Sequence, residues 1–163
     1  MINNTKSRIR NSLLVLLLTV CYICLKMKTK EIWGYRKKIK KIQKLYMIAN
    51  KWLSLEVCGK QLDGVIAQNG YKTIALYGMG DLGQRLSEKF NVSEKVDVLY
   101  AIDQNAENLS MILPVYSFEE ALQLEKPDLI IVTIYCSDGS LVDLLRKNFS
   151  CQVWTIEDLL NEA

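Results

Sequence analysis

Histidine is absent from the 163 residues, and this absence removes several classes of enzyme. Mechanisms that use an imidazole as general base, including the Ser-His-Asp and Cys-His arrangements, are excluded. The only Tyr-x-x-x-Lys pair, Tyr22 with Lys26, belongs to an apolar segment. The sequence also has no Walker lysine and no carboxylate pair spaced for acid–base work. Catalysis by this chain alone is therefore not expected.

The cysteines lack the spacing of a disulfide scaffold. There are five, an odd number, which favours a reducing compartment. Cys21 and Cys24 form a CxxC pattern, but it lies in an apolar run with no second pair. We interpret both as small apolar residues of a hydrophobic helix, because zinc needs further ligands. No metal site is predicted.

Negative charge is scarce in the first third of the chain. Residues 1–60 carry 14 Lys and Arg against two Asp and Glu, a net +12, whereas residues 61–163 carry 7 against 16, a net −9. The overall +3 conceals this asymmetry. We predict three parts: a hydrophobic anchor segment at 1–30, a basic amphipathic helix at 31–59 and an α/β domain at 60–163.

The segment Ser12–Leu25 has no charge and follows a basic flank. As a helix it covers about 21 Å, less than the roughly 30 Å of a bilayer's hydrocarbon core. Three interpretations stay open: a membrane anchor that spans or dips, a helix facing protein, and a cleaved signal peptide. The larger excess of Lys and Arg after the segment predicts that the remaining chain lies on the cytoplasmic side of the membrane.

Apolar residues recur every three or four positions from Glu31 to Val57. The spacing forms a heptad pattern, with lysines and one arginine between its members, Tyr35, Ile39, Ile42, Tyr46, Ala49 and Leu53. Such a helix either associates with another copy or protein, or packs on the following domain. Its basic residues fit an anionic membrane surface, and nucleic acid is not expected as the partner.

A glycine-rich turn dominates the acidic part. Lys72–Tyr77 is predicted as a buried strand that runs into Gly78-Met79-Gly80-Asp81-Leu82-Gly83, a Gly-x-Gly-x-x-Gly pattern opening a helix. In this pattern Gly78 allows the tight turn, Gly80 lets a phosphate approach the backbone, and Gly83 lets the helix lie near the strand. Phosphate would bind the free N–H groups at the helix N-terminus.

Strands and helices alternate after this turn, which predicts a Rossmann-like parallel sheet with strand order 3-2-1-4-5. The expected elements are a short helix at Lys60–Gln68, a helix at Asp81–Phe90, a strand at Val96–Ile102, an extended piece at Pro114–Tyr116, a capped helix at Ser117–Leu124, a strand at Leu129–Ile134, a helix around Leu141–Leu145, a strand at Cys151–Trp154 and a terminal helix capped by Thr155 and Asp158.

The carboxyl ends of the first and fourth strands should form a ligand crevice. Asp103 lies twenty positions beyond the last glycine, where an acid holds a ribose hydroxyl. The loop Thr133–Ser137 should line the same crevice. The predicted cofactor-binding residues are Gly78, Met79, Gly80, Asp81, Leu82, Gly83, Asp103 and Thr133. An unoccupied scaffold is the alternative, because Asp81 can satisfy the helix end and repel phosphate.

Residues 70–160 resemble the small Rossmann-like domains of bacterial surface-polysaccharide enzymes. The resemblance lies in Ile74–Gly83, Tyr100–Asp103, Leu113–Ser117 and Asp128–Thr133. Its examples are the N-terminal domains of nucleotide-sugar acyltransferases and of membrane-bound sugar dehydratases. It implies NAD(P) or a nucleotide-sugar bound through the glycines and Asp103. Those enzymes carry their chemistry in a further domain, and no such domain is expected within this sequence.

Together these features predict a membrane-associated, non-catalytic module that binds NAD(P) or a nucleotide-sugar in surface-polysaccharide biosynthesis. One alternative is a half-site subunit of a sugar-nucleotide dehydrogenase or epimerase, completed by a partner. The other is an interaction scaffold whose heptad helix binds protein while the crevice stays empty.

Overall fold

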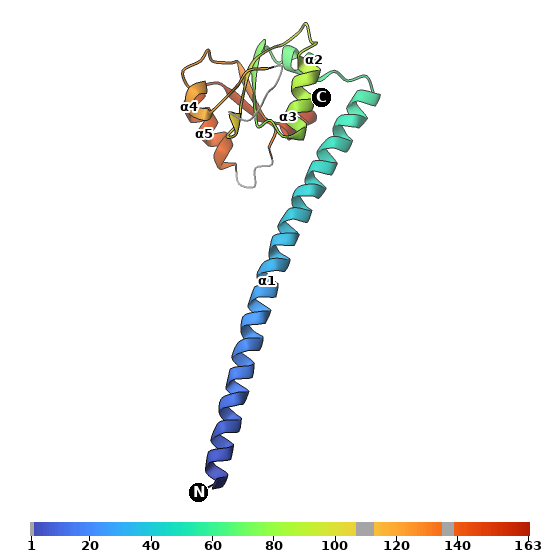
Figure 1. The fold of residues 1–163 in the computed structure, drawn as a ribbon. Helices are drawn as coiled ribbons and strands as arrows, with labels where there is room; N and C mark the ends of the chain where they lie inside the picture. Colours follow the sequence, from blue (N-terminus) through green and yellow to red (C-terminus); the bar gives the residue numbers. More distant parts are fainter. Residues whose placement is uncertain (1, 107–112, 135–138) are drawn as a thin grey trace. The chain divides into compact units, whose positions relative to one another are not determined.

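The computed structural model describes residues 2–106, 113–134 and 139–163, and of residues 2–13 and 15 only the backbone. The chain divides into two compact units, Met1–Lys44 and Leu45–Ala163. The described elements (Figure 1) are α1 (Ile2–Val57), α2 (Leu62–Gln68), β1 (Thr73–Tyr77), α3 (Asp81–Phe90), β2 (Asp97–Ile102), β3 (Val115–Tyr116), α4 (Phe118–Ala121), β4 (Leu129–Val132), α5 (Ser140–Phe149), β5 (Gln152–Thr155) and α6 (Ile156–Glu162).

The five strands form one parallel sheet in the order β3-β2-β1-β4-β5, which confirms the predicted Rossmann-like topology. β1 is central and pairs with β2 on one side and with β4 on the other. All four residues of β4 are buried, as expected for an interior strand that is apolar on both faces. The chain order reverses beside β1, so the ends of β1 and β4 form the switch point of the sheet.

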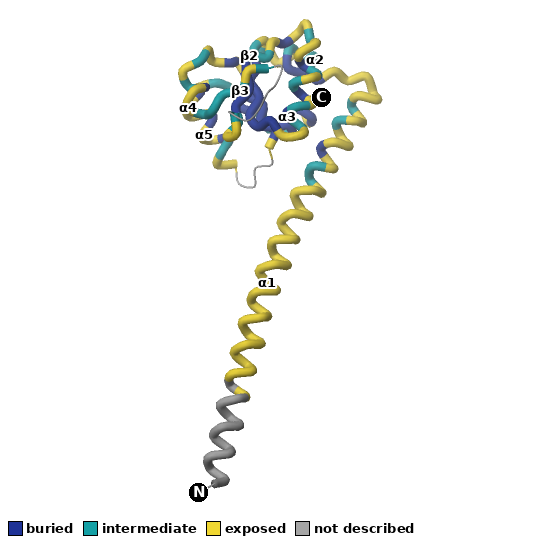
Figure 2. Tube along the Cα trace, in the orientation of Figure 1, coloured by how far each residue is buried: buried dark blue, intermediate teal, exposed yellow. Residues whose placement is uncertain are grey.

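Two apolar clusters cover the two faces of the sheet. Ile74, Leu76 and Ile131 point to one face, where they pack with α2, α3 and α6. Ala75 and Ile130 point to the other, beside α4 and α5. Figure 1 shows these helices on opposite sides, and Figure 2 shows the buried residues concentrated in the strands. Because the switch point is fixed from both faces, the loops that follow β1 and β4 start from rigid positions.

The end of α1 forms part of the α/β unit. Ile48 is buried in the first cluster, and Trp52 and Leu55 pack against the same cluster. These three residues lie on a different side of the helix from Tyr46 and Leu53, which stay 69% and 62% exposed. The helix therefore does pack on the domain, one of the two predicted options, but through residues outside the heptad pattern.

Gly59 ends α1, as predicted. It has φ +72°, a left-handed conformation that glycine adopts without steric cost. The N–H of Gly59 donates to the carbonyl of Glu56 at 3.0 Å, and the N–H of Lys60 donates to that of Leu55 at 2.9 Å. This pair of bonds is the Schellman arrangement, which satisfies the last helical carbonyls.

Two predicted caps are confirmed, but the predicted end of α4 is wrong. Ser117 forms a capping box with Glu120, and Thr155 forms one with Asp158. However, α4 ends at Ala121 and not at Leu124. After Ala121 the backbone makes tighter bonds, such as that from the N–H of Leu124 to the carbonyl of Ala121 at 3.2 Å, as the chain turns toward β4.

Candidate functional site

The glycine turn follows β1 directly and requires its first glycine. Gly78 has φ +95°, and its N–H donates to the carbonyl of Ile102 at the end of β2, at 2.8 Å. A Cβ at this position would lie 2.2 Å from Cγ2 of Ile134. Any side chain here would therefore meet both backbone strain and a steric clash.

Gly83 brings α3 close to the turn. A Cβ on this residue would lie 2.0 Å from the carbonyl oxygen of Gly78 and 3.0 Å from Oγ1 of Thr133. The nearest atom is backbone, so no side-chain rotation could relieve the contact. The helix can start this near the strand only because residue 83 has no side chain, which is the packing role predicted for the last glycine.

Gly80 is the open position of the turn. It is the N-cap of α3 with φ −70°, it is exposed, and a Cβ added there would meet no atom within 4 Å. The first N–H groups of an α-helix have no partner within the helix, and a glycine cap offers them no side-chain acceptor. These donors, with the positive end of the helix dipole, are what an anion requires.

Thr133 supports the turn from β4. It is the residue directly after that strand and is only 4% exposed. Its hydroxyl lies 3.1 Å from the carbonyl oxygen of Tyr77 and is also hydrogen-bonded to that of Gly78. Its N–H donates to Tyr77 at 2.9 Å. The hydroxyl predicted to line the crevice is thus bonded to the turn itself.

Asp103 lies at the end of β2, beside the turn, as predicted. Its Oδ2 accepts the N–H of Met79 at 2.7 Å, and its Oδ1 accepts the N–H of Asn105 at 2.9 Å. The residue is half-buried. Each carboxylate oxygen has further lone pairs, so these two bonds leave acceptor capacity for a ribose hydroxyl. The structure brings Asp103 and the glycines together.

The remaining predicted site residues differ in which of their groups a ligand could contact. Met79 is 2% exposed and its side chain is part of the core. Leu82 is half-buried and packs against the same cluster. Only the backbone of these two residues is suited to contact a ligand. Asp81 is exposed in the first turn of α3, where its charge stabilises the helix and opposes an anion.

Sequence reasoning missed two residues at the turn. The side-chain amide of Gln84 donates to the carbonyl of Met79 at 3.0 Å and holds the middle of the turn. Ile134 contributes the methyl group nearest to Gly78. Neither belongs to a recognisable pattern, since both act through contacts that only the folded chain creates. Of the loop predicted to line the crevice, Tyr135–Ser137 lie outside the described residues.

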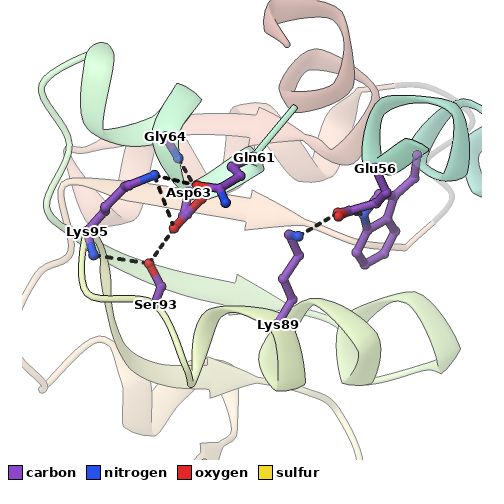
Figure 3. A network of polar contacts seen from close by, with 8 residues as sticks. Glu56, Gln61, Asp63, Gly64, Lys89, Ser93 and Lys95 are labelled. Carbon is purple, nitrogen blue, oxygen red and sulfur yellow. Dashed lines mark hydrogen bonds and ion pairs between the residues drawn. The ribbon is translucent and has the colours of Figure 1, made fainter. Parts of the chain in front are cut away.

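Charged residues also gather at the opposite, amino-terminal edge of the sheet, beside a surface hollow of about 540 Å³ whose lining includes Lys72, Ser93 and Lys95. Figure 3 shows that Ser93 and Lys95 bond to Gln61 and Asp63. Nζ of Lys95 donates to Gln61 at 2.7 Å, and the hydroxyl of Ser93 donates to Asp63 at 2.8 Å. We interpret Gln61, Asp63, Ser93 and Lys95 as structural, because their side chains bond to one another.

Fold and turn together define a Rossmann-like α/β protein with a glycine-rich turn at its switch point. No protein-family model, curated protein or solved structure matches the chain significantly. Of the predicted resemblance, the structure confirms the Rossmann-like fold alone, and no family is identified.

Two further results concern metals and membranes. Among residues 2–106, 113–134 and 139–163, no group of Cys, Asp and Glu is arranged to hold a metal ion. Within the same part of the chain, no helix contains a stretch long and apolar enough to cross a membrane.

Proposed function

We propose that this protein is a non-catalytic nucleotide-binding module whose ligand is NAD(P) or a nucleotide-sugar. One observation carries the proposal: Gly80 leaves open space at the N-terminus of α3, in a turn already fixed by its neighbours. A diphosphate would bind the N–H groups of the first turn, and Asp103 would accept a ribose hydroxyl. The turn lies at the switch point, where open α/β sheets bind their ligands.

Association with the cytoplasmic face of a membrane is the second part of the proposal. The apolar side chains of α1 that the structure describes between Leu14 and Leu25 are exposed, with Leu16, Leu17 and Leu18 between 61% and 62%. The net charge of +12 over residues 1–60 would add attraction to anionic lipid. A role in surface-polysaccharide biosynthesis rests on the resemblance of residues 70–160 and would place the module beside membrane-bound sugar chemistry.

A ligand panel on the full chain in nonionic detergent tests the nucleotide site. Thermal unfolding is measured with NAD, NADP, UDP-sugars and ATP, and calorimetry measures affinity. A ligand at a hundredfold excess over its Kd stabilises a protein by about 2.7 kcal/mol, or several degrees in Tm. We expect NAD(P) or a UDP-sugar to raise Tm, and no ligand to do so in the variant Gly80→Asp.

Gly80→Asp is an informative control because this variant is expected to fold. The added side chain would meet no atom within 4 Å of its Cβ, and aspartate is a favoured N-cap residue. Its carboxylate would lie where the phosphate approaches. If the wild-type protein is folded but no ligand of the panel changes its Tm, ligand binding is refuted. A shift that Gly80→Asp retains would locate binding elsewhere.

A scaffold with an empty crevice is the second candidate function. It is favoured by the bonds that Thr133 and Asp103 make to the turn, which keep its shape without a ligand. The exposed charge of Asp81 supports the same interpretation. If no ligand of the panel changes the Tm of the folded protein, this candidate is favoured over the first.

Cell fractionation tests membrane association. Removal of residues 1–30 is expected to move the protein from the membrane pellet to the soluble fraction, because it removes Ser12–Leu25. The matched control replaces Lys37, Lys40 and Lys41 by glutamine, which should weaken binding to anionic lipid but leave the apolar segment intact. An unchanged distribution of the truncated chain would contradict the anchor.

A further inference from the structure

The first compact unit leaves a long apolar seam uncovered. In α1 the heptad spacing extends toward the N-terminus beyond Tyr35, and every described member of the seam is exposed. We define the heptad seam as Leu14, Leu18, Cys21, Leu25, Lys28, Ile32, Tyr35, Ile39 and Ile42. The exposed fractions of its isoleucines are 50%, 53% and 64%. Such a sustained 3.5-residue spacing is the pattern of helices that pair side by side.

Charged residues lie mainly off the seam. In heptad notation, the seam fills positions a and d, and Lys30, Lys37 and Lys44 fall at position f, on the far side of the helix. Lys28 is the single seam residue with a charge. An anionic surface could therefore bind the lysines while the seam is covered by a helix.

Charge complementarity indicates what covers the seam. Glu31 occupies position g, and Arg36 occupies position e of the following heptad. When two such helices pair in parallel and in register, g of one faces the following e of the other, and pairs at these positions select partner and orientation. The only other charged g residue from Leu25 to Lys44 is Lys38, which would face the neutral Gln43. A second copy of this chain supplies both members of the Glu31–Arg36 pair.

We propose that the chain self-associates in parallel and in register through the heptad seam. Within one chain Glu31 makes only a surface ion pair with Lys28, at 3.1 Å, between side chains that are 50% and 75% exposed. Exposed pairs of this kind contribute little and do not compete strongly with pairing between helices. The inference is independent of the nucleotide proposal, because no seam residue belongs to the glycine turn.

Cysteine cross-linking of the full chain in nonionic detergent tests the geometry. In a background with the five native cysteines replaced by serine, Ile42→Cys is compared with Lys41→Cys. Position 42 lies in the seam and meets its own counterpart only in a parallel, in-register pair, whereas position 41 lies outside it. We expect disulfide-linked dimer from Ile42→Cys to form about tenfold faster than from Lys41→Cys, since bonding needs Cβ atoms within about 4.5 Å. Equal rates would overturn the proposal.

A charge swap tests the partner. Analytical ultracentrifugation in the same detergent is expected to give at least two copies for the wild type. Arg36→Glu should raise Kd about fivefold or more, because each pair contributes modestly and its reversal adds repulsion. The double variant Glu31→Arg, Arg36→Glu should restore the wild-type value. The proposal would be overturned if the wild type stayed monomeric at all concentrations. It would also be overturned if the double variant had a Kd as high as that of Arg36→Glu. Gly80→Asp is the matched control and should leave association unchanged.

Discussion

Replacing Gly83 by alanine is expected to destabilise the α/β unit severely, although it adds only one methyl group. The new Cβ would lie 2.0 Å from the carbonyl oxygen of Gly78, whereas non-bonded carbon contacts are relaxed near 3.5 Å. Relief would require α3 to move away from β1 by about 1.5 Å, the difference between these distances. That movement would also displace Leu86 and Phe90, which are 0% and 1% exposed.

Overpacking usually costs about 1–3 kcal/mol and more where the backbone cannot yield. We therefore expect Gly83→Ala to lose at least about 3 kcal/mol, a large part of the roughly 5–15 kcal/mol that stabilises a typical protein. With a urea dependence of about 2 kcal/mol per molar, the unfolding midpoint should fall by about 1.5 M. A Trp33→Phe background restricts the fluorescence signal to Trp52 and Trp154, which both pack against the core.

Gly80→Ala is the matched control, from the same turn. Its φ is −70° and its Cβ would meet no atom within 4 Å, so the change in stability should stay within about 1 kcal/mol. A midpoint for Gly83→Ala within about 0.3 M of the parent would refute the reasoning. It would mean that α3 and β1 can separate freely at the turn.

The remaining predictions concern polar groups beside β4. Thr133→Val should cost about 1–2 kcal/mol, because it removes the buried hydroxyl that bonds to the carbonyls of Tyr77 and Gly78, whereas Thr133→Ser should cost less. Urea titration measures both, and equal midpoints for valine and wild type would contradict the role of the hydroxyl. Hydrogen bonds from the N–H groups of Thr73 and Lys72 to Oδ2 of Asp128, each 2.9 Å long, lower the pKa of this carboxyl. The ionised Asp128 carboxylate should therefore stabilise the fold fully above about pH 4, and this stabilisation should be lost as the pH falls below that value. Asp128→Asn should flatten the acid limb of the curve of unfolding free energy against pH. An acid limb that is identical in the variant would contradict the assignment.

The fold follows closely from local patterns. The Schellman end at Gly59 and the capping boxes at Ser117 and Thr155 each depend on residues within a few positions of one another. The strand order follows from the alternation of strands and helices with right-handed crossovers. These features need no knowledge of distant contacts, which is why the sequence is sufficient to predict them.

The site is predictable in its glycines but not in their supports. Gly78 and Gly83 occupy a spacing whose geometry is general. That Thr133 bonds to the turn, and that Gln84 holds the carbonyl of Met79, depends on how closely β4 and α3 approach β1. Likewise, the heptad periodicity includes Ile42, which stays exposed, and leaves out Ile48, which packs on the domain. The choice depends on the shape of the surface that the helix meets.

The bonds from Thr133 and Asp103 also mean that the glycine turn is preorganised. A loop that becomes ordered only when its ligand arrives must lose conformational entropy at that moment, and affinity falls accordingly. Here the Thr133 hydroxyl and the Asp103 carboxylate hold the backbone beforehand. A ligand could thus bind with few contacts and still bind well. Equally, the turn could keep its shape in a variant that no longer binds a ligand. A substitution of Gly80 that abolishes binding need not unfold the protein.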